Sequence, residues 1–184
     1  METDDRPDEW LMGQVALGKR ECLSPLVHRH AAGLMTFIQR MVGDHHQSEE
    51  LFQEVFLAVW THSRSYRYPR SFKTWLFGIA VKKCRAEYRK QTFRIGGAKQ
   101  EITMLPDAAA TPVEAAIQSE TSSLVAEAVA QMPTAQRSVL VLRVWNHLSY
   151  AEIARVVGRS EATVRSHMFH GLASLRKYLE PRMQ

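Results

Sequence analysis

The sequence has few cysteines, no long apolar run and no apolar N-terminal segment. Its two cysteines, Cys22 and Cys84, are too few for a disulfide framework and lack the spacing of a zinc ribbon. No apolar run approaches the roughly 18 residues that a membrane span needs. The first ten residues, METDDRPDEW, are acidic where a secretory signal is basic and then apolar. We therefore expect a soluble, cytoplasmic protein that is not inserted in a membrane.

Motifs for catalysis and metal binding are also missing. The sequence contains no His-Glu-x-x-His, no phosphate-binding glycine loop and no visible triad. His28 and His30 lie two residues apart on an expected helix, so their side chains diverge by roughly 200°. A zinc site that combines Cys22 with histidines close in space stays an open alternative to ordinary surface histidines. We expect no enzyme, no catalytic residue, no metal, no cofactor and no small-molecule substrate.

Charge is distributed in four blocks along the chain. Residues 1–63 have 5 basic and 10 acidic residues, whereas residues 64–94 have 10 basic residues and 1 acidic residue. Residues 95–133 have 1 basic and 5 acidic residues, and residues 134–184 have 8 basic and 3 acidic residues. Two basic blocks separated by an acidic one indicate two contacts with a polyanion. The alternative is an arginine-rich surface that only meets solvent.

Apolar residues follow a helical period almost everywhere, and no segment alternates as a strand does. One helix runs from Leu23 and ends at Gly43, a typical residue just past a helix C-terminus. The next is expected to begin with Ser48 as its N-cap, after His45 and His46 in a turn. Its interior, residues 51–60, is apolar on two adjacent faces. This pattern places the helix in the middle of a bundle or against a partner protein.

A third helix is expected after Ser71, and its far end is strongly basic. The helical pattern then disappears in an acidic stretch that contains Gly96-Gly97, Pro106 and Pro112. The predicted fold is all-α, with two small helical domains joined by a flexible linker. We place the domains at residues 1–93 and 119–184, and the linker at residues 94–118.

The most specific local pattern is a helix-turn-helix over residues 148–167. Ser149 and Glu152 form a capping box, and Gly158 stands where the turn requires a positive φ. Ser160 then caps a second helix whose inner face comprises Val164, Met168, Leu172, Leu175 and Leu179. The opposite face starts with hydrogen-bonding side chains, as in a recognition helix that enters the major groove. An ordinary helical hairpin is the alternative.

Three stretches together resemble a known family. Residues 48–60 resemble its polymerase-binding helix, residues 72–80 the start of its −10 recognition helix, and residues 132–175 its −35 reading domain. The chain thus resembles an extracytoplasmic-function (ECF) sigma factor of the sigma-70 superfamily, a specificity subunit of bacterial RNA polymerase. The likeness covers most of residues 20–180 in the family's order. It implies a transcription initiation factor that melts promoter DNA by preferring the unpaired strand.

The resemblance also implies roles for individual residues. Those expected to bind core RNA polymerase are Glu49, Glu50, Leu51, Gln53, Glu54 and Phe56. Those expected at the −10 element are Arg64, Tyr66, Arg67, Tyr68, Arg70, Lys73, Trp75, Lys82, Lys83, Arg85 and Arg89, with Tyr66 and Tyr68 stacking on unpaired bases. Those expected at the −35 element are Ser160, Thr163, Arg165, Ser166, Phe169, His170, Arg176 and Lys177.

The chain departs from the family pattern in two places. Gln47 stands where family members often have an acidic residue, and the loop from Tyr66 to Arg70 is more basic and aromatic than in many of them. The family usually has an anti-sigma factor, and the apolar surface around Phe52, Phe56 and Trp60 favours such a partner here. Two other functions stay open: a stand-alone helix-turn-helix regulator, and a basic nucleic-acid enzyme.

Overall fold

A computed structural model describes residues 5–94 and 123–182. The described residues form helices joined by short turns, with no strand among them, so the all-α prediction is confirmed. The expected linker, residues 94–118, lies outside the described residues except for Arg94, the last residue of a helix.

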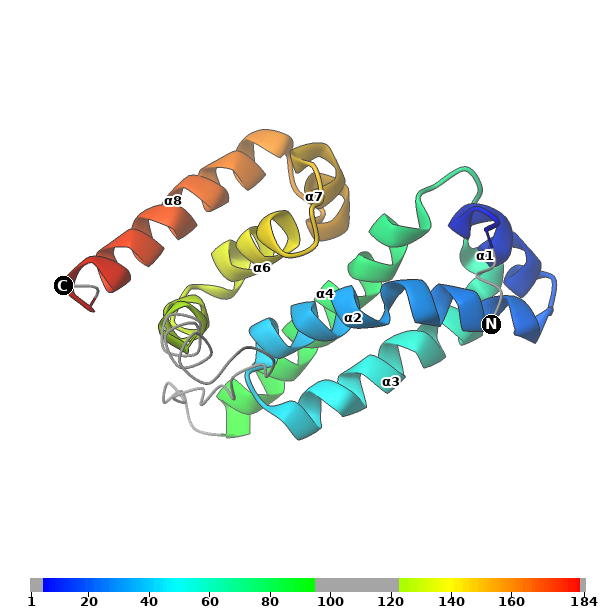
Figure 1. Ribbon diagram of the computed structural model, residues 1–184, viewed down its shortest axis with the longest axis horizontal. Coiled ribbons are helices and arrows are strands. Elements are labelled where there is room, and N and C mark those ends of the chain that lie inside the picture. Colours follow the sequence, from blue (N-terminus) through cyan, green and yellow to red (C-terminus); the bar gives the residue numbers. More distant parts are fainter. Residues whose placement is uncertain (1–4, 95–122, 183–184) are drawn as a thin grey trace, which may run out of the picture.

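Three long helices form the body of the first part: α2 (Leu23–Val42), α3 (His45–Thr61) and α4 (Phe72–Arg94). Each packs against the other two. A shorter helix, α1 (Asp8–Ala16), lies at one end of this bundle, and two 3-10 turns, η1 (Arg20–Cys22) and η2 (Ser63–Ser65), connect its elements (Figure 1). The sequence analysis did not predict α1.

The apolar period of α2 produces the core that it shares with α3 and α4. Leu34, Phe37 and Ile38 are fully buried, and the ring of Phe37 meets Phe77 of α4 edge-to-face with 5.6 Å between centroids. Burying one such side chain stabilises the fold by about 1.5–3 kcal/mol. Gly43 ends α2 with φ at 81°, as the sequence predicts.

The predicted start of α3 is wrong by one turn. Asp44 is the N-cap, and its carboxylate accepts a hydrogen bond from the Gln47 amide at 2.7 Å. Ser48 lies inside the helix, fully buried, and its hydroxyl donates to the carbonyl of Asp44. Because Asp44 follows Gly43 directly in extended backbone, helix begins at once, and His45 and His46 belong to its first turn.

The second part contains a helical stretch over residues 123–130, followed by α6 (Thr134–Val144), α7 (Tyr150–Val157) and α8 (Glu161–Leu179). A 3-10 turn, η3 (Glu180–Arg182), follows α8. Helices α6, α7 and α8 pack on one another, and α8 runs from its start beside α7 to the C-terminal end of the molecule (Figure 1). Their shared core is mostly apolar, with Val139, Leu140, Leu142, Ile153 and Val164 almost completely buried.

The inner face of α8 follows the prediction except at Leu172, and Leu175 further along is partly buried against the core. Val164 and Met168 are buried, whereas Leu172 is 46% exposed, so its predicted burial is wrong. Gly171 occupies the buried position instead, and a Cβ added to it would lie 3.8 Å from the Cβ of Gln136 in α6. The close approach of α6 at Gly171 turns Leu172 outward.

The two parts pack together through α2 with α6 and through α4 with α7. Arg137 of α6 is only 3% exposed at this junction. Its guanidinium donates to the carbonyl of Met41 in α2 at 2.8 Å, and also to the carbonyls of Ala130 and Met132. One buried cation therefore joins the end of α2 to the start of the second part.

Candidate nucleic-acid interface

The helix-turn-helix is stabilised by hydrogen bonds within its own short segment. Ser149 and Glu152 form the predicted capping box: the Glu152 amide donates to Ser149 Oγ at 3.2 Å, and the Ser149 amide donates to the Glu152 carboxylate at 2.7 Å. Gly158 ends α7 with φ at 68°, and the Thr163 amide donates to Ser160 Oγ at 3.2 Å. These contacts confirm the predicted caps and turn.

The outer face of α8 presents the predicted reading residues to solvent. Arg165, Ser166, Phe169 and His170 are all exposed, Phe169 to 71%. The Arg165 guanidinium pairs with Glu161 one turn earlier and lies 4.5 Å from the ring centroid of Tyr150. Arg165 is therefore held over the start of α7 at the surface, where a base edge can compete for its donors.

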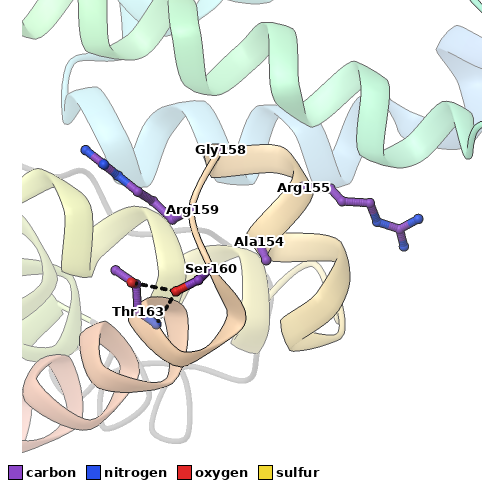
Figure 2. Close-up of a pocket in the computed structure, with 6 residues that line it drawn as sticks. All are labelled: Ala154, Arg155, Gly158, Arg159, Ser160 and Thr163. Atoms are coloured by element: carbon purple, nitrogen blue, oxygen red, sulfur yellow. Dashed lines mark hydrogen bonds between the residues drawn. The ribbon is translucent and has the colours of Figure 1, made fainter.

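An open hollow of about 610 Å³ lies at the turn between α7 and α8 (Figure 2). Its lining residues are Ala154, Arg155, Gly158, Arg159, Ser160 and Thr163. The side chains of Arg155 and Arg159 point to opposite sides, while Ser160 and Thr163 hydrogen-bond to each other at 2.8 Å (Figure 2). The two arginines, which the sequence analysis did not select, thus flank the turn rather than converge on one small anion.

The loop between α3 and α4 exposes four of the five predicted −10 residues that it contains. Arg64, Arg67 and Arg70 are exposed, and Tyr68 is 75% exposed. The Arg67 guanidinium donates to the carbonyl of Arg64 at 2.9 Å. This loop therefore presents one aromatic ring among three cations, an arrangement suited to stacking on a base beside its phosphates.

Two other predicted −10 residues are buried, one in this loop and one in the first turn of α4. Tyr66 is 6% exposed and Trp75 is 9% exposed, and their ring centroids lie 5.3 Å apart. The Tyr66 hydroxyl donates to the carbonyl of Arg70. The expectation that Tyr66 stacks on an unpaired base is corrected in this conformation, because its ring packs on Trp75 and Phe72.

The basic face of α4 divides into exposed residues and residues with partners in the protein. Lys82 and Arg89 are exposed. The Lys83 ammonium pairs with Glu54 of α3 at 2.7 Å, which joins a predicted DNA contact to a predicted polymerase contact. The Lys73 ammonium donates to the carbonyl of Asn146, in the second part, at 2.8 Å.

Basic residues of the two parts face each other where α4 meets α7. Burial first, and then the nearby cation of Arg159, lower the pKa of Arg85 from its ordinary value. Where α2 meets the end of α6, the guanidinium of Arg40 lies 4.0 Å from the ring centroid of Trp145. One residue from each basic block, Arg85 and Arg159, thus lies at the junction of the two parts.

Helix α3 has an acidic face and a buried face. Glu49, Glu50, Gln53 and Glu54 are exposed. Leu51 and Phe56, also predicted to bind polymerase, are 5% and 8% exposed, so they support this face from the core rather than form it.

One apolar side chain interrupts the acidic face of α3. Leu57 is 60% exposed and follows Gln53 by four residues and Glu54 by three, which places it on the same side of the helix. That spacing was the available signal, although the sequence analysis did not select Leu57. Gln47, the residue that departs from the family pattern, donates from its side-chain amide to Glu87 of α4 at 2.9 Å.

The described residues form no group of three His, Cys, Asp or Glu side chains placed to hold a metal ion. Cys22 and Cys84 are both buried as free thiols, and burial raises the pKa of Cys84 to about 12. Within the described part of the chain, no helix has both the length and the apolar character to cross a membrane.

Family models match both parts of the chain. The description of one is Sigma-70 region 2, over residues 26–94, and that of the other is Sigma-70, region 4, over residues 122–175. Among curated proteins, the ECF RNA polymerase sigma factor SigL of Mycobacterium tuberculosis is 31% identical over 170 residues, covering 90% of this chain and 93% of the relative. The ECF RNA polymerase sigma factor SigX of Bacillus subtilis is 33% identical over 151 residues, covering 80% and 78%.

Solved structures show the same fold. CnrH, in complex with the cytosolic domain of CnrY, is similar with a TM-score of 0.72 and 25% identity, covering 95% of this chain and 97% of that one. The sigma factor RpoE of Bartonella quintana, in complex with the anti-sigma factor NepR, is similar with a TM-score of 0.71 and 18% identity, covering 85% and 96%.

Proposed function

Because this chain belongs to the ECF sigma factors, with their regions 2 and 4, we propose that it binds core RNA polymerase and directs it to promoters. In this proposal the chain recognises a −35 and a −10 promoter element and promotes melting of the DNA for transcription initiation. It works by binding energy rather than catalysis, in the cytoplasm where the polymerase acts. The observation that carries the proposal is a pair of separate exposed basic surfaces beside one exposed acidic helix.

The −35 element is assigned to α8. Arg165 and Ser166 offer hydrogen-bond donors for base edges, and Phe169 and His170 lie one turn further along the same exposed face. Ser160, Thr163, Arg176 and Lys177 are assigned to the DNA backbone, with Arg155 and Arg159 added because they flank the turn. An exposed recognition helix with a basic turn is what supports this assignment.

The −10 element is assigned to the loop before α4 and to the basic face of that helix. Tyr68 stacks on an unpaired base while Arg64, Arg67 and Arg70 bind the strand. Lys82 and Arg89 bind duplex phosphates, and Lys73, Lys83 and Arg85 join them once they leave their partners in the protein. A preference for the unpaired strand shifts the promoter toward its melted state.

Core polymerase is assigned to the acidic face of α3. Glu49, Glu50, Gln53 and Glu54 are exposed there around Leu57, a charged rim with an apolar centre that is typical of protein interfaces. This explains why a DNA-binding chain has an acidic helix: its partner there is a protein, not phosphate. The domain bounds 1–93 and 119–184, with the linker 94–118 between them, are part of the same proposal.

An anti-sigma factor is proposed as a further partner. The support is that CnrH and RpoE, which share the fold, were both solved with a second protein bound. Such a protein would cover the polymerase-facing surface around Leu57. The apolar surface expected at Phe52, Phe56 and Trp60 is not exposed as predicted: Phe56 is buried, and Phe52 and Trp60 are partly buried against the core. If the product of a neighbouring gene neither bound this chain nor blocked its transcription, this part of the proposal would fail.

The proposal is tested by run-off transcription with core RNA polymerase on a pool of genomic DNA, with and without this chain. The expected result is a set of new transcripts whose start sites share two upstream motifs. Absence of stimulation, together with sequence-specific DNA binding without polymerase, would favour the stand-alone regulator instead.

A further inference from the structure

Helix α1 lies against the elements that carry the proposed −10 contacts. It packs on η2, on α2 and on α4, with Leu11, Met12 and Val15 buried beneath it. The Sigma-70 region 2 model begins at residue 26, so α1 precedes the matched segment. Of the two acidic residues at its start, Asp8 contacts α2 and Glu9 contacts the beginning of α4.

Glu9 provides a hydrogen-bond acceptor for the first residue of α4. The Phe72 amide donates to Glu9 Oε1 at 3.1 Å, across 63 residues of chain. The first amides of a helix have no partner within the helix, and a carboxylate at that end is also favoured by the helix dipole. The local alternative is weak, since Ser71 Oγ accepts only from the Thr74 amide, at 3.4 Å.

Asp8 fixes the position of Glu9. Its two carboxylate oxygens lie 2.6 Å from the guanidinium of Arg29 and 2.5 Å from Nε2 of His30, both in α2. Arg29 also donates to the carbonyl of Arg6 at 2.7 Å. The start of α1 is thus held on α2, so the Glu9 carboxylate meets α4 at a defined place.

The loop before α4 is held from the same side by aromatic packing. The ring of Phe72 meets His30 edge-on at 5.3 Å between centroids, and Tyr66 packs on Phe72 and Trp75. The Tyr66 hydroxyl donates to the carbonyl of Arg70. Burial first, and then the carboxylates of Glu9 and Asp8, raise the pKa of Tyr66 to about 12, which agrees with their closeness to the ring.

We propose that Glu9 is a positioning residue for −10 recognition: through the Phe72 amide it holds the start of α4 and the loop that presents Arg67, Tyr68 and Arg70. The inference rests on the proposed function. Glu9 acts through the backbone of α4, so its loss alters how the −10 bases are read and leaves −35 recognition unchanged.

The test compares Glu9→Leu with Glu9→Gln. The two replacements have nearly the same size, but only glutamine retains a side-chain oxygen that accepts a hydrogen bond. The matched control is Glu21→Gln, which removes one negative charge from an exposed residue of the same part. Each variant is assembled with core polymerase and assayed on the natural promoter and on promoters substituted at −10 or at −35.

We expect Glu9→Leu to reduce discrimination between natural and substituted −10 elements about fivefold, the size of a typical lost helix cap. Discrimination at −35 and affinity for core polymerase stay as in the wild type. Glu9→Gln and Glu21→Gln retain wild-type −10 discrimination. Amide hydrogen exchange of the free protein adds a second readout: Phe72 exchanges faster in Glu9→Leu and not in Glu9→Gln.

The inference is overturned if Glu9→Leu discriminates between natural and substituted −10 elements as well as the wild type does. It is also overturned if Glu9→Gln loses as much −10 discrimination as Glu9→Leu. An equal loss at −10 and −35 would also overturn it, because that pattern indicates general destabilisation. Failure of the proposed function has a different signature: the wild-type chain itself would direct no transcription.

Discussion

The two surfaces proposed to bind DNA differ in how the chain holds them in place. The helix-turn-helix depends on side chains three residues from the amides they cap, Ser149 with Glu152 and Ser160 with Thr163. The loop before α4 depends on Glu9, 63 residues away, and on an aromatic cluster that buries Tyr66. The proposed recognition helix can therefore be specified locally, whereas the loop proposed to bind an unpaired base requires support from distant elements.

The largest expected effect on stability comes from replacing Arg137, whose hydrogen bond to Met41 joins the two parts. Arg137→Met keeps an apolar stem but removes the donors to three buried carbonyls, of Met41, Ala130 and Met132. We expect the free energy of unfolding, measured by urea denaturation, to fall by about 3 kcal/mol. The matched control is Arg176→Met at an exposed position of α8.

A loss below about 1 kcal/mol in Arg137→Met would show that these bonds are replaced by water. It would also show that the second part is stable without its hydrogen bond to α2. The helix-turn-helix would then depend even less on distant residues than the loop before α4 does.

A smaller effect is expected within the helix-turn-helix. Ser149→Ala removes one half of the capping box and lowers the free energy of unfolding by about 1 kcal/mol. Hydrogen bonds from Ser149 lower the pKa of Glu152, so this stabilisation is present above the ordinary pKa of a glutamate and is lost as the pH falls below it. Denaturation measured from neutral to acid pH checks both statements.

The control for the cap is Ser174→Ala, an exposed serine in α8. If the two serine variants were equally stable at neutral pH, the claim that local caps hold the helix-turn-helix would be contradicted.

The smallest effect appears only in alkali. Because burial raises the pKa of Tyr66 to about 12, its neutral phenol stabilises the fold below the ordinary tyrosine pKa of 10, and this stability is lost as the pH rises from about 10 to 12. Absorbance of the tyrosinate should show one phenol that ionises near pH 12. Tyr66→Phe removes that component and Tyr68→Phe retains it; the opposite assignment would mean that Tyr68 is the buried ring.

The sequence predicted the parts of the molecule that depend on near neighbours. The capping box, the positive φ of Gly158 and the cap at Ser160 are all confirmed, since each is a contact within three residues or a single backbone angle. The end of α2 at Gly43 was predictable for the same reason.

The parts that the sequence did not predict depend on distant contacts. Helix α1 is short, and its role comes from Glu9 meeting Phe72. The resemblance implied that Tyr66 stacks on an unpaired base, but its ring is buried against Phe72 and Trp75. Leu172 keeps the helical period yet faces solvent, since the crossing of α6 determines which residue of α8 is buried.

The most direct test of two separate reading surfaces measures each of two variants on each of two altered promoters. Arg165→Ala and Tyr68→Ala are each assembled with core polymerase and assayed on promoters substituted at −35 or at −10. The account predicts that Arg165→Ala loses about tenfold in discrimination at −35 only, and Tyr68→Ala a similar factor at −10 only, while affinity for core polymerase is unchanged. If either variant lost discrimination at both elements, or lost polymerase binding to the same extent, the assignment of two separate reading surfaces would be contradicted.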